Sequence, residues 1–431
     1  MDQRKRRTIL FLGIALFAMF FGAGNLLLPA FLGFETRTGW TTTFSGFALT
    51  AILAPFLAIY AVALSGNYFT DLGSRANVKL AYALSLVNVL CIGPLIALPR
   101  SGASVYEVAI QPLLPDAQPV WVSVVFFGVV MILSLSLERI TEILGKFLGP
   151  LLLILLLILI IPGFFTTNSV EFEAMVSNDL FYKGFNEGYQ TMDVLAALIF
   201  AVILIAGAKQ KSYAHVNDRI EVVVKSAIFA AACMLLVYGG LFYLGGNADI
   251  NHPEIGRSDL LLHIAQQNLG SNGIYLISVL MMVASATTAV ALTAGSANFF
   301  ERLTKGKLGY IEAVISITIV SVILGITGVD AIIEYAAGLL NFIYPVTLVL
   351  ILSVLLFGGT IKNQKPYFIT LIVTMLFSSL RVLVKWFPEQ TSFNDILQML
   401  PLSDYNLEWV LPAVLTFLIS CFALGRNLNH Q

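Results

Sequence analysis

Charged residues are scarce in this chain of 431 residues: Asp, Glu, Lys and Arg together make up 11% of it, while 58% is hydrophobic. Soluble domains carry about 25% charged residues, so most of this surface cannot face water. The net charge is −1, and no basic tract other than Arg4-Lys5-Arg6-Arg7 is present, which argues against a surface for nucleic acid. We therefore expect the lipid bilayer to surround most of the protein.

Cysteine and histidine are scarce as well, with three and four residues. The cysteines lie far apart inside apolar runs, so they indicate neither a disulfide framework nor a zinc site. The histidines fall in predicted loops or the tail, where solvated surface residues are commoner than metal ligands. The residues are Cys91, Cys233, Cys421, His215, His252, His263 and His430. The spans also lack a nucleotide-binding glycine loop and a Ser/His/Asp arrangement, so we expect neither an enzyme nor an organic cofactor.

Long apolar windows follow one another along the whole chain. They fall near 8–32, 40–65, 79–105, 119–137, 146–165, 187–208, 222–246, 273–299, 309–328, 331–357, 367–387 and 408–426. Windows of about 20 residues span a bilayer, and lipid offers no hydrogen-bond partners to an open backbone. The sequence therefore predicts an all-α integral membrane protein with about twelve transmembrane helices in a single domain, 1–431.

The basic start followed by Thr8 to Phe21 is also typical of a secretory signal peptide. The apolar stretch resumes at Leu26, however, and further windows follow, which favours an uncleaved first span. Loops assigned alternately to the two sides place about three quarters of the 24 Lys and Arg residues on the side of the N-terminus. Because positive charge is retained on the cytoplasmic side, we expect both termini in the cytoplasm. The long connections 170–187 and 247–272 then lie outside.

The first window contains Gly22-Ala23-Gly24-Asn25 near its middle, followed by Pro29. Two glycines and a proline permit an unwound stretch, which is tolerated at membrane depth only where it is buried in protein or lines a polar cavity. Such a stretch exposes amide donors and carbonyl acceptors that can hold a carboxylate and a small cation. The alternative is a glycine packing face with a proline kink.

The sixth window begins with Tyr189-Gln190-Thr191-Met192-Asp193, which places a carboxylate inside an apolar run. Such residues usually face a water-filled pathway, a cation or a partner, although an Asp at the outer interface is the alternative. Irregular features in the first and sixth spans are typical of a five-plus-five inverted repeat. The predicted repeats cover about 8–165 and 187–357, with two extra helices at about 367–426.

The eighth window carries Ala284-Ser285-Ala286-Thr287-Thr288. The hydroxyls can bond their own helix and let neighbouring helices approach, the commoner use in membranes. Alternatively, Thr287 and Thr288 can give oxygen ligands to a cation such as Na⁺.

Kink signals stand at Gly93-Pro94 in the third window, and at Gly338, Asn341 and Pro345 in the tenth. Arg100 follows the first of these, near the end of its window. We expect Arg100 to extend to the outer interface, with Glu107 as an alternative partner.

Four segments in this order resemble the branched-chain amino acid:cation symporter family of the BrnQ type, the LIVCS family. They are Phe20-Phe21-Gly22-Ala23-Gly24-Asn25-Leu26, Gly93-Pro94 with Pro99-Arg100, Gly188-Tyr189 with Thr191-Met192-Asp193, and Thr287-Thr288. The resemblance covers essentially the whole chain. It implies a leucine-transporter (LeuT) fold, with broken helices 1 and 6 and two added C-terminal helices, and uptake of leucine, isoleucine and valine coupled to Na⁺ or H⁺.

The resemblance also implies site residues. The amides of Ala23 and Gly24 would hold the substrate carboxylate. The implied substrate-binding residues are Gly22, Ala23, Gly24, Asn25, Met192, Asp193, Ala196 and Phe200, and the implied Na⁺ ligands are Ala18, Phe21, Ala284, Thr287 and Thr288. The chain departs from the pattern in the sixth window, where Ala196-Ala197 stands in place of an expected glycine.

The function expected is import of branched-chain amino acids across the cytoplasmic membrane, coupled to Na⁺ or H⁺ and without an obligate protein partner. Met192, Leu195, Ile199 and Phe200 are candidates for an apolar pocket for the substrate side chain. An alternative is a transporter of the same architecture for another small substrate, such as a nucleobase or an organic amine. A channel is not expected, since no filter sequence is present. Proton coupling through Asp193 and sodium coupling through the Thr287-Thr288 pair both stay open.

Overall fold

The secondary structure is helical throughout the part of the chain that the computed structural model describes, residues 3–166, 179–213, 215–250, 255–386 and 391–425, where no strand occurs. The N-terminal helices are α1 (Gln3–Phe20), α2 (Ala23–Thr36), α3 (Trp40–Ala48), α4 (Ala54–Ser65), α5 (Phe69–Gly73), α6 (Val78–Leu90), α7 (Ala97–Ser104), α8 (Pro119–Ser134), α9 (Leu137–Ile143) and α10 (Gly149–Thr166). The C-terminal helices are α11 (Leu180–Glu187), α12 (Asp193–Gln210), α13 (Val216–Gly246), α14 (Arg257–Leu269), α15 (Asn272–Leu303), α16 (Tyr310–Gly325), α17 (Val329–Phe357), α18 (Lys365–Trp386), α19 (Thr391–Gln398) and α20 (Val410–Gly425). Short 3₁₀ or π-helical turns are η1 (Arg37–Gly39), η2 (Leu49–Leu53), η3 (Cys91–Leu95), η4 (Val105–Ile110), η5 (Leu144–Leu148), η6 (Gly188–Thr191) and η7 (Ser403–Tyr405).

Among the described residues, eight helical segments are long and apolar enough to cross a membrane, and three shorter apolar helices accompany them. The longest segment, Ala23–Ser65, contains the second half of the first predicted window and the whole of the second. Each predicted window is helical over most of its described length, with interruptions that include 21–22 and 192. Phe387 and Arg426 lie outside the described residues, as do 167–178 and 251–254 of the predicted outer connections. The predicted all-α class is confirmed, because the described residues form helices and no strand. Helices satisfy their backbone hydrogen bonds internally, as lipid requires.

The third predicted window bends at the predicted position. Helix α6 passes through η3 into α7, and Gly93 inside η3 has a non-helical ψ of −117°. Pro94 follows, whose ring removes a backbone donor and prevents a regular helix. The bend turns α7 away from the direction of α6. In the tenth window, by contrast, α17 continues through Pro345.

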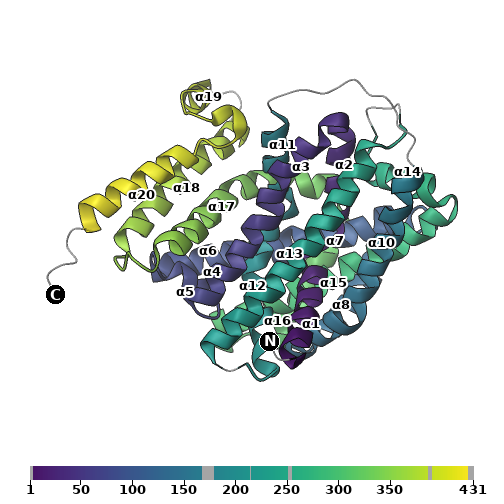
Figure 1. Cartoon of the computed structure of the whole chain (residues 1–431), viewed down its shortest axis with the longest axis horizontal. Helices are drawn as coiled ribbons and strands as arrows, with labels where there is room; N and C mark the ends of the chain where they lie inside the picture. The colour runs from purple at the N-terminus through teal and green to yellow at the C-terminus, as the bar shows by residue number, and fades with distance from the viewer. Residues whose placement is uncertain (1–2, 167–178, 214, 251–254, 387–390, 426–431) are drawn as a thin grey trace.

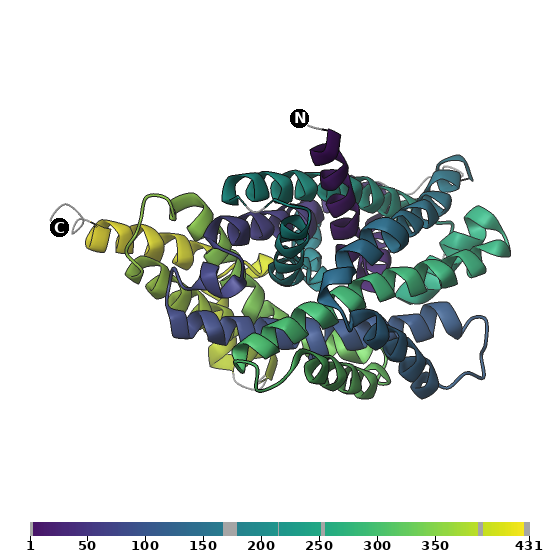
Figure 2. The same ribbon diagram turned by 90° about the horizontal axis from the view of Figure 1, so that it is seen from below.

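The helices form a bundle with α1, α12, α13 and α15 in its middle, and α18 to α20 lie at one end of the molecule (Figure 1). The view from below shows the same separation, with α20 at the edge of the molecule (Figure 2). Helix α18 contacts both α17 and α20, so α17 connects this end to the rest.

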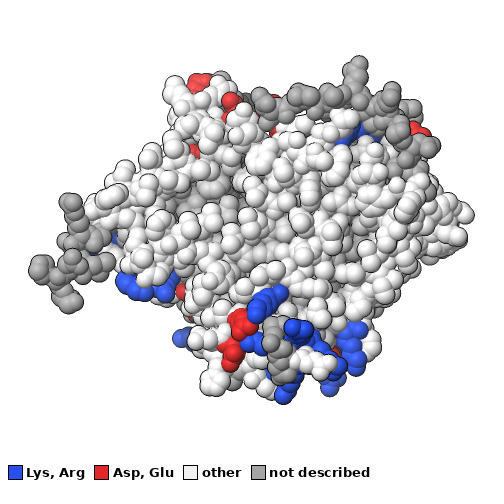
Figure 3. All heavy atoms as spheres, viewed as in Figure 1, with Lys and Arg blue, Asp and Glu red and all other residues white. Residues whose placement is uncertain are grey.

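Lys and Arg side chains gather along the lower edge of the face drawn in Figure 3, near the start of α1. There Lys5 Nζ lies 2.6 Å from Glu221 Oε2, which ties α1 to the start of α13. The broad middle of this face is free of charge in the same view, as a lipid-facing belt requires. The direction of insertion stays a prediction.

A buried ion pair joins the C-terminal helices. Arg381 on α18 donates to both carboxylate oxygens of Glu408, with distances of 3.0 Å from Nε and 2.8 Å from Nη2. The Glu408 side chain is only 2% exposed. We expect Glu408→Ala to destabilise the protein by about 3 kcal/mol or more, because it leaves a guanidinium largely buried without its partner.

This loss is measured as a lowered midpoint of thermal unfolding in detergent. Glu312→Ala is a control, since its carboxylate caps α16 at an exposed site. Equal midpoints for the two variants would contradict a stabilising role of the ion pair.

Candidate functional site

The first predicted span is broken as expected. Helix α1 ends at Phe20 and α2 begins at Ala23, with Phe21 and Gly22 outside both helices. In the described part of the chain, no hydrogen bond reaches the carbonyl oxygens of Ala18 and Phe21 or leaves the amides of Ala23 and Gly24. The break therefore offers free acceptors at the end of one half-helix and free donors at the start of the other.

Asn25, just after the break, connects three helices. Its Nδ2 lies 2.8 Å from the carbonyl oxygen of Phe20 and 3.0 and 2.9 Å from the two carboxylate oxygens of Asp193. The hydroxyl of Tyr238 on α13 lies 2.5 Å from the same Nδ2 and donates to Asp193 Oδ2 over 3.2 Å. All three polar side chains are buried, so each depends on the others for hydrogen bonds. Asp193 is therefore buried inside the protein and is not a solvated residue at the membrane interface.

The sixth span is broken too, but upstream of the position where a glycine was expected. The backbone passes from α11 through η6 to Met192, which has a left-handed conformation with φ 61° and ψ 13°, and α12 begins at Asp193. Left-handed conformations are costly for residues with a Cβ and concentrate at functional sites. Ala196-Ala197 lies inside regular helix.

Arg100 does not extend to the outer interface, which corrects the sequence prediction. Its side chain is buried, and Nη1 donates to the carbonyl oxygen of Gln190 over 2.9 Å. The alternative partner, Glu107, instead accepts a bond from the amide of Val329. The bend at Gly93-Pro94 directs α7 inward, so Arg100 reaches the break of the first span, where its guanidinium covers Gly24.

A cavity of about 30 Å³ lies between the two breaks. It is lined by Phe20, Gly22, Ala23, Gly24, Asn25, Ile92, Ala97, Arg100, Ser101, Thr191, Met192, Asp193, Ala196, Phe200, Thr288 and Leu292. All eight predicted substrate-binding residues are in this set. A space of this size holds about one water molecule, so the site is closed in this conformation.

Leu195 and Ile199 do not line the cavity, so that part of the predicted apolar pocket is wrong. Residues 193, 196 and 200 share one face of α12, because they are three and seven positions apart. Leu195 and Ile199 project from other faces. Ile92 and Leu292 complete the apolar wall instead.

The predicted Na⁺ ligands gather beside this cavity. Thr288 Oγ1 on α15 donates to the carbonyl oxygen of Met19 over 2.8 Å, and Thr287 Oγ1 donates to the carbonyl oxygen of Ala284 over 2.8 Å. Helices α1 and α15 are therefore in contact at the break. Each hydroxyl oxygen keeps lone pairs for a cation, and the free carbonyls of Ala18 and Phe21 lie within two residues of Met19 along the chain. Their role as ligands stays a prediction.

Sequence reasoning missed Tyr238 altogether and misplaced Arg100. A signal for Tyr238 was present, since a hydroxyl inside an apolar window needs a buried partner. Its partner, Asp193, is 45 residues away, and periodicity within one span does not identify it.

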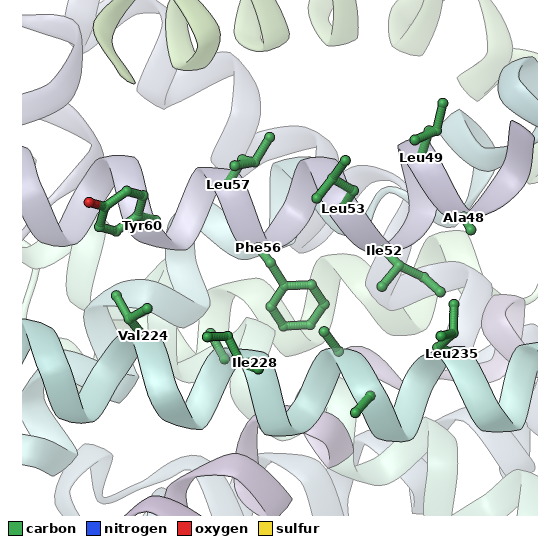
Figure 4. A pocket seen from close by; sticks show the side chains of 13 residues that line it. Ala48, Leu49, Ile52, Leu53, Phe56, Leu57, Tyr60, Val224, Ile228 and Leu235 are labelled. Atoms are coloured by element: carbon green, nitrogen blue, oxygen red, sulfur yellow. The ribbon is translucent and has the colours of Figure 1, made fainter. Parts of the chain in front are cut away.

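A larger groove, of about 490 Å³, lies elsewhere, between η2 and α4 on one side and α13 on the other (Figure 4). Apolar side chains line it, and Tyr60 carries the one side-chain polar atom among them. Phe56 projects from α4 toward α13 in this view and packs against Phe20 in a tilted arrangement, with 5.4 Å between ring centroids. The groove offers no partner for a charged ligand, so the small cavity is the candidate site.

The sequence matches the family model described as branched-chain amino acid transport protein over residues 5–426. Two relatives that are provisionally named branched-chain amino acid carrier proteins also match nearly the whole chain. One from Staphylococcus saprophyticus is 31% identical, covering 95% of this chain and 94% of its own. One from Staphylococcus epidermidis is 30% identical, covering 97% and 98%.

Solved transporter structures share the fold. A manganese transporter from Eremococcus coleocola has a TM-score of 0.65 at 13% identity, covering 99% of this chain and 96% of that one. A nucleobase-cation-symport-1 family transporter has a TM-score of 0.62 at 13% identity, with 97% and 92% covered. A Na⁺-coupled sialic acid symporter has a TM-score of 0.59 at 13% identity, with 96% and 89% covered. The predicted LeuT-like fold class is confirmed.

Proposed function

We propose, since this chain belongs to the family of branched-chain amino acid transport proteins, that it imports leucine, isoleucine and valine together with Na⁺ or H⁺. Family and fold are those of membrane transporters and not of enzymes, so the chain is a secondary transporter that crosses the membrane several times. The substrates and the coupling ion are the proposal. It rests on a buried cavity whose opposite charges suit a zwitterionic amino acid.

The carboxylate end of the substrate would bind near Gly24. The free amides of Ala23 and Gly24 lie at the start of α2, where the helix dipole favours an anion. The guanidinium of Arg100 lies against Gly24 and adds a positive charge. This combination supports carboxylate binding more strongly than a helix end alone.

The ammonium end would face Asp193, which lines the same cavity and carries the opposite charge. Arg100 and Asp193 form no ion pair within the described residues, which leaves each charge for the substrate. Ile92, Phe200 and Leu292 provide an aliphatic and aromatic wall for the side chain. Such a wall separates leucine from valine by only about 1–3 kcal/mol, so overlapping specificity is expected.

The oxygens at the break of α1 favour Na⁺ as the coupling ion. Hydroxyls and carbonyls are hard, neutral ligands, and two of the carbonyls lack any hydrogen-bond donor within the described chain. Proton coupling through Asp193 is the competing form of the proposal. The two forms predict different responses to imposed gradients.

We also propose that residues 8–165 and 187–357 are inverted repeats and that both termini are cytoplasmic. Each repeat begins with a broken helix, and the two breaks meet where Asn25 contacts Asp193. The basic residues along the lower edge of the face drawn in Figure 3 support this orientation.

Uptake of radiolabelled leucine into proteoliposomes tests the function. With a Na⁺ gradient or a pH gradient imposed separately, we expect uptake that at least one gradient stimulates, and that excess isoleucine or valine inhibits. Uptake indifferent to both gradients would reject symport. Inhibition by a nucleobase or an organic amine, with none by leucine, would favour the alternative cargo.

Gly24 is small because Arg100 occupies the space beside it. A Cβ at position 24 would collide with Nη2 of Arg100, whereas a Cβ at Gly128 on α8 meets nothing within 4 Å. We expect Gly24→Ala to weaken leucine binding by about tenfold or more, because the guanidinium must leave the carboxylate site. Gly128→Ala is the matched control. Equal leucine affinity of both variants, measured by binding to purified protein, would contradict the close contact.

A further inference from the structure

A second cavity, also of about 30 Å³, lies between α5, α6, α12 and α15. It is lined by Tyr68, Phe69, Thr70, Ser85, Asn88, Val89, Leu198, Ile199, Val202, Gly295, Asn298, Phe299 and Arg302. Apart from Ile199, which the sequence suggested for the apolar pocket, none of these residues belongs to the predicted substrate or cation site. The lining combines apolar side chains with amide, hydroxyl and guanidinium groups, as a site for an aliphatic amino acid requires.

The second cavity lies about one helical turn beyond the first on three separate helical segments. On each segment, one residue lines the first cavity and a residue three or four positions away lines the second. These pairs are Ile92 and Asn88 on η3 and α6, Ala196 and Ile199 on α12, and Leu292 and Gly295 on α15. Three or four residues of helix correspond to a rise of about 5 Å. The two cavities are therefore neighbours along one direction, which leads toward Arg302 at the end of α15 and the basic connection after it.

A thin apolar partition separates the cavities. Ile199 projects toward Gly295, where a Cβ would collide with Cγ2 of Ile199. The side chain of Ile199 therefore lies close to α15 at the level between the two cavities. No charged group of the described chain forms this part of the wall.

Two polar atoms in this lining are buried without a partner. Ser85 Oγ and Asn88 Oδ1 accept and donate no hydrogen bond, although both residues are only 1% exposed. The other atom of the amide, Asn88 Nδ2, donates to the carbonyl oxygen of Leu195 over 3.1 Å, which fixes the side chain. Buried unpaired oxygens are costly unless a ligand or water satisfies them, and they suit an ammonium donor.

Arg302 stands at the mouth of this cavity. Its exposed guanidinium lies over the ring of Tyr68, 3.0 Å from the centroid. A cation on an aromatic face contributes about 0.5–1 kcal/mol at an exposed site, less than a hydrogen-bonded carboxylate. A carboxylate can therefore replace the ring as the partner of Arg302.

We propose that this cavity is a release site for the transported amino acid on the side of Arg302, which we assign to the cytoplasm. The ammonium group binds Asn88 Oδ1 and Ser85 Oγ. The carboxylate replaces the Tyr68 ring as the partner of Arg302, and the movement of Arg302 opens the mouth of the cavity. This inference rests on the proposed function. It adds a second binding site to the central one.

The test compares leucine transport from the two faces of reconstituted, uniformly oriented protein. Ser85→Ala removes an unpaired hydroxyl, which costs the fold nothing, and Arg302→Gln changes an exposed side chain. We expect the leucine KM on the Arg302 face to rise about threefold in Ser85→Ala and about tenfold in Arg302→Gln, with the KM on the opposite face unchanged. Arg302→Lys should lie between wild type and Arg302→Gln.

Ser278→Ala is the matched control, because Ser278 on α15 is equally buried and unpaired and lines neither cavity. It should behave as wild type on both faces. An unchanged KM on the Arg302 face in Ser85→Ala and Arg302→Gln would overturn the release site, as would equal shifts on both faces, which place the effect in the central cavity. A wild-type protein that transports no leucine would instead reject the proposed function itself.

Discussion

Asp193→Ala is expected to lower leucine uptake by about a hundredfold or more, since the loss leaves the buried Tyr238 hydroxyl without an acceptor at about 1–3 kcal/mol. The Asn25 amide also loses the carboxylate but keeps the carbonyl oxygen of Phe20 as an acceptor. In the proposed function, the same change also removes the negative charge that would bind the substrate ammonium. Initial rates of radiolabelled leucine uptake in proteoliposomes measure the effect.

Tyr238→Phe is the graded control for this prediction. It removes one donor and keeps the ring, which packs against Phe21 and Phe47. We expect a loss of about tenfold at most, because Asn25 still bonds Asp193. Size-exclusion profiles of both variants separate a transport defect from misfolding. A rate for Asp193→Ala as high as that of Tyr238→Phe would show that the carboxylate is not the centre of the site.

Thr288→Ala is expected to abolish the stimulation of uptake by Na⁺, or to raise the Na⁺ concentration for half-maximal uptake by about tenfold. The hydroxyl lies at the break of the first span, where it donates to the carbonyl oxygen of Met19. In the proposed Na⁺ site, its loss would remove one of few ligands of the cation. Uptake is measured over a series of Na⁺ concentrations at fixed pH.

Thr288→Ser keeps the hydroxyl and should keep the Na⁺ dependence, which distinguishes ligation from packing. The same series with Asp193→Asn separates the two coupling ions. If Asp193→Asn alone loses coupling while Thr288→Ala responds to Na⁺ as wild type does, the cation site at the threonine pair is refuted and proton coupling is favoured.

The positions of the spans and of the first break were predictable because they depend on local properties. Hydropathy over about 20 residues determines where helix forms in lipid, and Gly22 and Gly24 permit an interruption nearby. Asp193 was identifiable for the same reason, as a charge inside an apolar run. These features need no knowledge of which helices are neighbours.

Arg100 and Tyr238 could not be placed in this way. Their roles depend on long-range contacts, with Gln190 for Arg100 and with Asn25 and Asp193 for Tyr238. The rule that basic residues near span ends extend to the interface fails for Arg100, because the bend at Gly93-Pro94 redirects its helix. That rule considers only how close a residue is to the end of its span, so it does not include the bend.

The residues of α12 that line the cavity were only partly predictable from the sequence. Helical spacing from Asp193 selects Ala196 and Phe200 and excludes Leu195 and Ile199, so periodicity alone could have corrected that prediction. The second break could not be found by searching for glycine, because Met192 adopts the left-handed conformation instead. Tertiary contacts must hold that backbone conformation, which a propensity scale does not include.

Arg100 and Asp193 place one positive and one negative charge around a single closed cavity, so their formal charges cancel. A zwitterionic amino acid adds no net charge. With the proposed symport, the accompanying cation is then the net charge carried inward in each cycle. Membrane voltage would contribute about 2.3 kcal/mol per 100 mV for one cation, equivalent to about fiftyfold accumulation. Transport would thus generate an electrical current, and a negative interior would drive leucine inward even at equal cation concentrations.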